Sequence, residues 1–232
     1  AGVRIIKMLI EGLKQAIPQL LNQVPILINQ LKAEFLKFVE KMKEIGTNIV
    51  EGIKEGIFIT GNTVIDALKT TVREDYTHPE LQWASDSRLI IITAHRRENL
   101  GEPMHQMFRA IRRIMDEHSD VKAIYPIHMN PVVREAAAKE LGGCDRIHII
   151  EPLEVLDFHN FLSRSYMILT DSGGIQEEAP SLGKPVIVLR DTTERPEGIK
   201  AGTLKLVGTD EEVIYNAFNT LLKDKSEYEK MS

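Results

Sequence analysis

Cysteine is almost absent from this chain of 232 residues, in which Cys144 is the single example. One cysteine excludes an internal disulfide and a cysteine-rich zinc site, and it fits a reducing compartment. No apolar run approaches the roughly 18 residues of a membrane span. The first residues also lack the basic, then apolar, then small-residue pattern of a secretory signal. Together these absences predict a cytoplasmic location.

Standard motifs for several chemistries are missing as well. The seven histidines form no HExxH motif, and none lies at ligand spacing from the cysteine, so no bound metal is expected. There is no GxxxxGK[ST] or GxGxxG loop for nucleotides, and no GxSxG elbow for a serine nucleophile. The net charge of −5 argues against a nucleic-acid partner, because nucleic-acid binders are normally basic.

The first 57 residues differ in composition and in hydrophobic pattern from the rest. They contain eight basic and six acidic residues, no aspartate, and only Phe35 and Phe38 as aromatics. Apolar residues recur there at the spacing of an amphipathic helix. Pro18 and Pro25 should break or kink that helix. The pattern therefore predicts two or three helices, over about 3–17, 25–45 and 47–55.

From residue 58 onward, short β-branched runs alternate with amphipathic stretches. We expect strands at 88–94, 122–127, 146–150, 166–170, 185–189 and 203–207. We expect helices at about 62–75, 102–117, 131–141, 155–164, 173–182 and 210–223. Apolar runs such as LIIITA are typical of strands buried on both faces. This alternation predicts a doubly wound parallel α/β sheet, with its ligand crevice at the carboxyl ends of the strands.

The most informative polar run is TDSGGIQEEA, which follows a predicted strand. The turn at Ser172 and Gly173 could bring backbone N–H groups and a hydroxyl close to phosphate oxygens. Glu178, further along, could accept hydrogen bonds from ribose hydroxyls. The alternative is that Asp171 or Ser172 only caps the following helix.

Three further polar runs follow other predicted strands. HRREN at 95–99 offers two arginines and a histidine to a diphosphate, or forms a basic turn paired with glutamates. YPIHMNP at 125–131 carries His128, and a lone histidine there is more often a hydrogen-bonded structural residue. RDTTERPE at 190–197 could be a surface ion-pair network. A common crevice remains the favoured interpretation, because the fold brings strand ends together.

Residues 58–232 closely resemble the C-terminal half of the bacterial non-hydrolysing UDP-N-acetylglucosamine 2-epimerases. The resemblance is carried by FITGNTVIDALKTTV, ITAHRRENLGEPM, YPIHMNPVVRE, LTDSGGIQEEAPSLGKPVIVLRDTTERPEGI and AGTLKLVGTD. It implies one Rossmann-like half-domain of the GT-B type, with a UDP-sugar in the cleft between two such domains. It also implies conversion of UDP-N-acetylglucosamine to UDP-N-acetylmannosamine by elimination and re-addition of UDP, without a metal, nicotinamide or other cofactor.

The resemblance also implies roles for individual residues that bind substrate. By motif, Ser172 and Gly173 resemble the diphosphate ligands and Glu178 resembles the ribose ligand. Phe158 resembles the residue whose backbone meets the uracil. Arg195 lies in the matching TTERPE run and is expected to bind substrate as well.

Four basic residues complete the roles that the resemblance implies. His95 resembles the family's active-site histidine, and His128, with Arg96 or Arg97, resembles positions at a second, regulatory UDP-sugar site. The family's first α/β domain supplies the carboxylates thought to transfer protons at carbon 2, and residues 1–57 do not resemble it. We therefore expect UDP binding without epimerisation by this chain alone. The alternatives are a non-catalytic UDP-binding or structural chimeric module, or a fragment of a GT-B glycosyltransferase.

Residues 1–57 are foreign to that family and weakly resemble phage tail tape-measure proteins, through the run GTNIVEGIKEGI. The favoured interpretation is a helical hairpin that packs on the domain and covers apolar surface. The other is a helix that self-associates or lies on a membrane surface. A homo-oligomer is a further expectation, since members of the resembled family are usually dimers.

Overall fold

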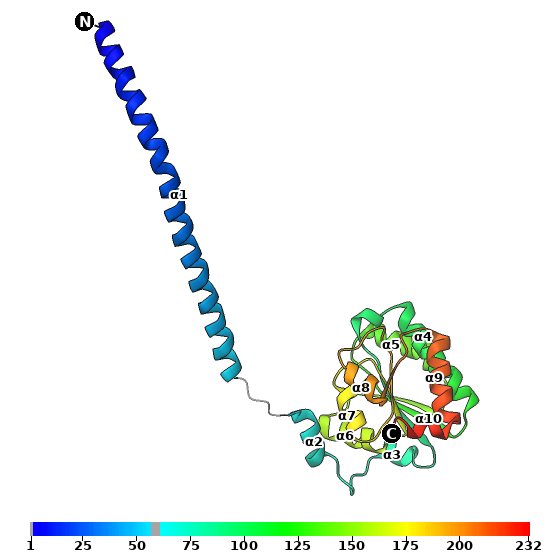
Figure 1. Cartoon of the computed structure of the whole chain (residues 1–232). Helices are drawn as coiled ribbons and strands as arrows, with labels where there is room; N and C mark the ends of the chain where they lie inside the picture. Colours follow the sequence, from blue (N-terminus) through cyan, green and yellow to red (C-terminus); the bar gives the residue numbers. More distant parts are fainter. Residues whose placement is uncertain (1, 57–60) are drawn as a thin grey trace. The chain divides into compact units, whose positions relative to one another are not determined.

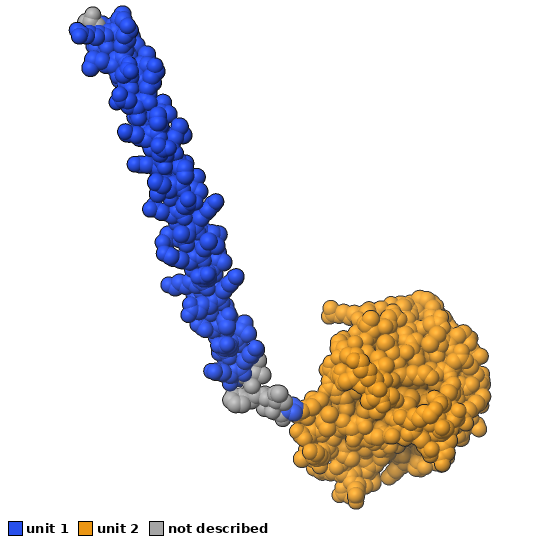
Figure 2. Space-filling model, in the orientation of Figure 1, with its two compact units in different colours: residues 1–61 blue, residues 62–232 orange. Residues whose placement is uncertain are grey.

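The computed structural model describes residues 2–56 and 61–232. It divides into two compact units, residues 1–61 and residues 62–232, which Figure 2 shows in different colours. The predicted boundary between residues 57 and 58 lies outside the described residues.

One continuous helix, α1 (Gly2–Glu55), makes up the described part of the first unit (Figure 1). The prediction of two or three helices is wrong, and so is the helical hairpin, because α1 runs through Pro18 and Pro25. A proline inside a helix removes its own N–H hydrogen bond and clashes with one carbonyl. Here long runs of helix-forming residues on both sides keep the helix continuous.

A narrow apolar stripe runs along α1. Its residues follow each other at steps of three or four, the spacing that keeps side chains on one face of a helix. No residue of Gly2–Glu55 is buried, and the side chains of the stripe are between 43% and 75% exposed. The apolar stripe consists of Ile6, Ile10, Leu13, Ile17, Leu20, Val24, Ile28, Leu31, Phe35, Phe38, Met42, Ile45, Ile49 and Ile53.

A sheet of parallel strands forms the centre of residues 62–232 (Figure 1). The strands are β1 (Arg88–Thr93), β2 (Val121–Pro126), β3 (Ile147–Ile150), β4 (Met167–Thr170), β5 (Val186–Val188) and β6 (Leu204–Leu206). The prediction of these strands is confirmed, each within one residue at either end. Their order in the sheet is β3-β2-β1-β4-β5-β6, and the five pairings are parallel. The order reverses between β1 and β4, and in doubly wound folds this switch point opens the ligand crevice.

Helices connect the strands, and the six predicted helices of this unit are all present. They are α2 (Thr63–Thr71), α4 (Glu102–Glu117), α5 (Pro131–Leu141), α6 (Val155–Arg164), α7 (Ile175–Ser181) and α9 (Glu211–Lys223). The short helices were not predicted, because so few residues carry no measurable periodicity. These are α3 (Pro79–Trp83), α8 (Pro196–Ala201), α10 (Lys225–Glu229) and the 3₁₀ helix η1 (Arg97–Asn99).

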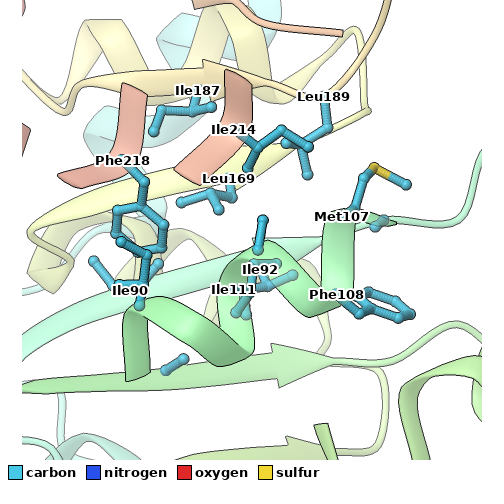
Figure 3. Close-up of a cluster of buried hydrophobic side chains, with 14 of the residues drawn as sticks. Ile90, Ile92, Met107, Phe108, Ile111, Leu169, Ile187, Leu189, Ile214 and Phe218 are labelled. Atoms are coloured by element: carbon cyan, nitrogen blue, oxygen red, sulfur yellow. The ribbon is translucent and has the colours of Figure 1, made fainter. Parts of the chain in front are cut away.

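The core lies on both faces of the sheet, because alternate residues of β1 point to opposite sides. On one face, Ile90 and Ile92 pack with Ile111 of α4 and Phe218 of α9 (Figure 3). On the other face, Ile91 belongs to a second cluster that includes residues of α6 and α7. This double burial explains the nearly unbroken apolar run LIIITA. It also fixes the strand ends, where the residues of the site lie.

Candidate functional site

A buried carboxylate organises the switch point. Asp171 follows β4 directly and is fully buried. Its Oδ2 atom accepts hydrogen bonds from the backbone N–H of His95 (2.9 Å) and of Arg96 (2.8 Å), and from Nδ2 of Asn99 (3.2 Å). Its Oδ1 atom is buried and has no hydrogen-bond partner among the described residues. Asp171 therefore fixes the loop after β1 to the loop after β4.

The capping interpretation of Asp171 and Ser172 is wrong. Helix α7 begins at Ile175, and its N-cap is Gly174, which makes no side-chain capping bond. The carboxylate of Asp171 is instead occupied by the loop after β1. This leaves the turn at Ser172 and Gly173 between the end of β4 and the start of α7.

The floor of the site consists of two threonines on the central strands. The hydroxyls of Thr93 and Thr170 lie 2.6 Å apart, and the backbone N–H of Ser172 donates to the Thr170 hydroxyl at 2.9 Å. Beside this turn lies the guanidinium of Arg96, whose Nη2 atom would be 3.6 Å from a Cβ placed on Gly173. The predicted phosphate-binding turn thus has a cation next to its backbone.

The two histidines predicted at strand ends meet each other. The rings of His95 and His128 are stacked, with 5.2 Å between their centroids. Both histidines are exposed and line a pocket of about 240 Å³ that also includes Phe158 and Ile175. The structure therefore brings together three of the predicted site residues. Arg97 is exposed at the start of η1 and does not line this pocket.

Glu178 lies in the first turn of α7, with its side chain 14% exposed. Burial, together with the charge of neighbouring Glu177, raises the pKa of the Glu178 carboxyl above its ordinary value. Its Oε2 atom is 3.8 Å from Nε2 of His159, and burial lowers the pKa of that histidine. Burial favours the neutral form of each group, so this contact is a weak ion pair. Glu178 is consequently a poorly solvated carboxyl that could hydrogen-bond to a hydroxyl group.

Arg195 takes part in a contact between helices. Its Nε donates to Oε1 of Glu177, and Nδ2 of Asn62 donates to the other oxygen of the same carboxylate. The backbone N–H of Arg195 also donates to the hydroxyl of Thr193 at 3.1 Å. The structure thus places Arg195 beside α7, where Glu177 neutralises its charge.

The start of the RDTTERPE run forms a second ion-pair group. Arg190 is only 5% exposed, and its Nε and Nη1 atoms donate to Glu98 at 2.8 Å and to Glu194 at 2.6 Å. The hydrogen bond from Arg190 lowers the pKa of Glu194 to about 2. An ion-pair network was one of the two interpretations of this run, and the structure shows one. It links the loop after β5 to the loop after β1.

Several residues of the site were missed from the sequence. The partners of Asp171, the position of His159 beside Glu178, and the hydrogen bond from Thr193 to Gln176 each join two different elements or loops of the chain. For Asp171 there was one signal, namely a charged residue placed directly after a largely apolar strand, Met167–Thr170. For His159 the sequence offered none.

Within 2–56 and 61–232, no three metal-ligating side chains gather in an arrangement that could hold a metal ion. Over the same ranges, no helix is both long and apolar enough to cross a membrane.

Comparison with known proteins identifies the family. The family model for UDP-N-acetylglucosamine 2-epimerase matches residues 36–232. The chain belongs to this family. The UDP-N-acetylglucosamine 2-epimerase of Bacillus subtilis is 67% identical over 178 residues, which are 77% of this chain and 47% of that protein. The chain spans about half the length of the curated relatives it matches.

Two solved structures agree with the fold. A structure of S. aureus MnaA with UDP has a TM-score of 0.73 and 56% identity, and it covers 74% of this chain and 47% of that one. The UDP-GlcNAc 2-epimerase of Neisseria meningitidis, bound to UDP-GlcNAc, has a TM-score of 0.69 and 43% identity over 77% of this chain and 52% of that one. The predicted Rossmann-like half-domain of the GT-B type is therefore confirmed. The family match begins within α1, and the comparisons give no support to a resemblance with tape-measure proteins.

Proposed function

We propose that residues 62–232 bind the UDP part of UDP-N-acetylglucosamine at the carboxyl ends of β1 and β4. One observation carries this proposal. In a chain of this family, the Ser172–Gly173 turn, the guanidinium of Arg96 and the largely buried Glu178 lie together at the switch point. The two related structures were solved with UDP or UDP-GlcNAc bound. A cytoplasmic location would agree with the lone cysteine.

The proposed contacts follow the chemistry of the nucleotide. Backbone N–H groups at Ser172 and Gly173 would bind the diphosphate, whose charge Arg96 offsets. Glu178 would accept hydrogen bonds from the ribose hydroxyls, and its burial would strengthen those bonds. The uracil would lie near Phe158, in the pocket that His95 and His128 also line. Arg195 would contact substrate only by giving up part of its contact with Glu177.

The proposed reaction of the whole enzyme is epimerisation at carbon 2. A proton leaves carbon 2, the bond from carbon 1 to the UDP oxygen breaks, and both steps reverse with the proton added on the opposite face. His95 would act near the phosphates, and His128 with Arg96 or Arg97 would form the regulatory site. The stacked rings of His95 and His128 would make the two sites neighbours.

We further propose that residues 1–232 alone bind UDP without epimerising the sugar. Proton transfer at carbon 2 needs carboxylates that we assign to the part of the relatives not covered by this chain. Each general acid or base typically contributes roughly 10²–10⁴-fold to a rate. Residues 58–232 would therefore be the nucleotide-binding half, and residues 1–57 would take no part in nucleotide binding.

Calorimetric titration with UDP and with UDP-N-acetylglucosamine, beside an epimerisation assay, tests the proposal. We expect saturable binding of both ligands and no product. Replacement of Glu178 by Ala should weaken UDP binding by about 10–100-fold, the loss expected for a hydrogen bond to a charged group. Glu135→Ala, an exposed carboxylate on α5, is the matched control and should bind UDP normally.

Three results would contradict the proposal. Absence of UDP binding would contradict the proposed nucleotide site. Normal UDP binding by Glu178→Ala would contradict the role of Glu178 as the ribose ligand. Turnover by the chain alone would show that residues 1–232 contain the proton-transfer groups.

A further inference from the structure

Helix α1 presents an apolar face that is free of polar side chains. A residue advances about 100° around an α-helix. On that geometry the apolar stripe fills one sector of about 100°, and the sector contains no charged or polar residue over Gly2–Glu55. An exposed face of this length is rare on soluble proteins unless another surface covers it.

The residues that would obstruct packing lie on the other faces of α1. Pro18 and Pro25 each follow a residue of the apolar stripe and therefore point about 100° away from it. The eight basic and six acidic side chains of the helix also lie outside the sector. The helix thus keeps one face suited to close contact along its whole length.

The spacing of the stripe identifies the shape of its partner. Steps of three and four residues are the pattern by which side chains of one helix fit between those of another. From Ile6 to Ile53 the average step is 3.6 residues, so two such helices would pack with little supercoiling. We propose that the apolar stripe packs against α1 of a second copy of this chain. This proposal is independent of the proposed nucleotide site.

Length distinguishes a second copy from the chain's own domain. A helix of 54 residues is about 80 Å long. A domain the size of residues 62–232 has a diameter of about 40 Å, so it could cover only about half of the stripe. A second α1 has the same length and the same spacing, and it could cover all of it.

The area of the stripe is sufficient for a stable dimer. Burying one Val, Leu or Ile side chain removes roughly 60–120 Å² from water. Over its fourteen residues the stripe could bury on the order of 1,000 Å² per helix. Standard interfaces bury about 800 Å² per partner.

The charges on α1 favour a protein partner over a lipid surface. Helices that bind membrane surfaces are rich in Lys and Arg on their polar face. Helix α1 instead carries nearly balanced charges, eight basic and six acidic residues, with five of each over residues 32–55, and Lys37 pairs with Glu34 at 2.9 Å. Balanced charges would let two copies approach without strong repulsion, whereas they offer little attraction to anionic lipids.

Sedimentation equilibrium of the full chain measures the association directly. We expect a dimer at micromolar concentration, with twice the mass of the chain. Leu31→Glu combined with Phe38→Glu places two charges in the stripe and should weaken the dimer by at least about 100-fold. The matched control combines Ile26→Glu with Leu36→Glu, at apolar residues that are similarly exposed but lie off the stripe, and it should remain dimeric.

Near-UV circular dichroism of the aromatic residues in 62–232 should be identical in all three proteins, which separates loss of association from loss of the fold. A monomeric wild-type chain would overturn the proposal, as would equal behaviour of the stripe and control variants. Binding of a monomeric wild-type chain to vesicles of phosphatidylcholine and phosphatidylglycerol would assign the stripe to a lipid surface instead.

Discussion

The Oδ2 atom of Asp171 accepts a hydrogen bond from the backbone N–H of His95 at 2.9 Å, across 76 residues of sequence. The same oxygen accepts hydrogen bonds from Arg96 and Asn99, so one buried atom binds three residues of the loop after β1. The two predicted halves of the nucleotide site, one after β1 and one after β4, are thereby joined through a single carboxylate. Ligand contacts made by either loop would depend on this bond.

Asp171→Ala should destabilise residues 62–232 by about 3 kcal/mol, because three donors would lose a charged acceptor in a buried place. Asp171→Asn keeps one acceptor oxygen and should have a smaller effect. Urea unfolding of the two variants and the wild type measures the difference. UDP affinity should fall in the same order, and an Ala variant as stable as the wild type would contradict this account.

Glu178 should give the stability a distinctive pH dependence. Because its pKa is raised in the folded protein, the folded state binds more protons than the unfolded state above the ordinary value of about 4.5. This group therefore lowers the free energy of unfolding as pH rises from 4.5 toward its raised pKa. Glu178→Gln removes the effect and should become more stable than the wild type over that range. The free energy of unfolding, measured in urea between pH 4 and 8, could instead change with pH in the same way for both proteins. That result would show that burial does not raise the pKa of this carboxyl.

Arg190 should stabilise the protein chiefly above pH 4.5. The pKa of Glu194 is lowered to about 2, so the ion pair contributes while the carboxylate is charged and is lost as pH falls from about 4.5 to 2. Arg190→Met should lower Tm by about 3 °C at neutral pH. The difference from the wild type should shrink in acid. A difference in Tm that stays constant with pH would assign the effect to packing alone.

A substitution at Phe218 would change the core without changing a residue of the candidate site. Its ring is fully buried between α9 and the sheet, so Phe218→Ala should cost about 3–5 kcal/mol of stability, as large-to-small core substitutions do. Association through α1 should persist in this variant under native conditions. Sedimentation and urea unfolding of the same sample would show whether the two units are independent.

The sheet could be predicted closely because its strands are buried on both faces. Ile90 and Ile91 point to opposite sides, and both sides are core, so consecutive residues of the strand, Leu89–Ile92, are apolar. Helix α5 was predicted to the residue because Asn130 caps it and Pro131 begins it. The prolines of α1 misled the prediction, since local rules favour a break while the apolar face continues across both of them.

The site could be predicted only in part. Convergence of strand ends predicts that His95 and His128 lie together, and their stacked rings agree. The role of Asp171 could not be predicted, because two of its three hydrogen-bond donors are main-chain N–H groups that any residue would supply. The proximity of His159 and Glu178 likewise depends on how α6 packs beside α7. Such contacts have no signature in the order of residue types.

The pairing of β1 with β4 also has a consequence for folding. Every other pairing in the sheet joins strands that are consecutive in the sequence, whereas Thr93 and Thr170 are 77 residues apart. Closing a longer loop carries a larger entropy cost, so β1–β2–β3 and β4–β5–β6 can each form before they dock. The hydrogen bonds of Asp171 join these two halves of the sheet. The capacity to bind a ligand would therefore appear last during refolding, after most of the secondary structure has formed.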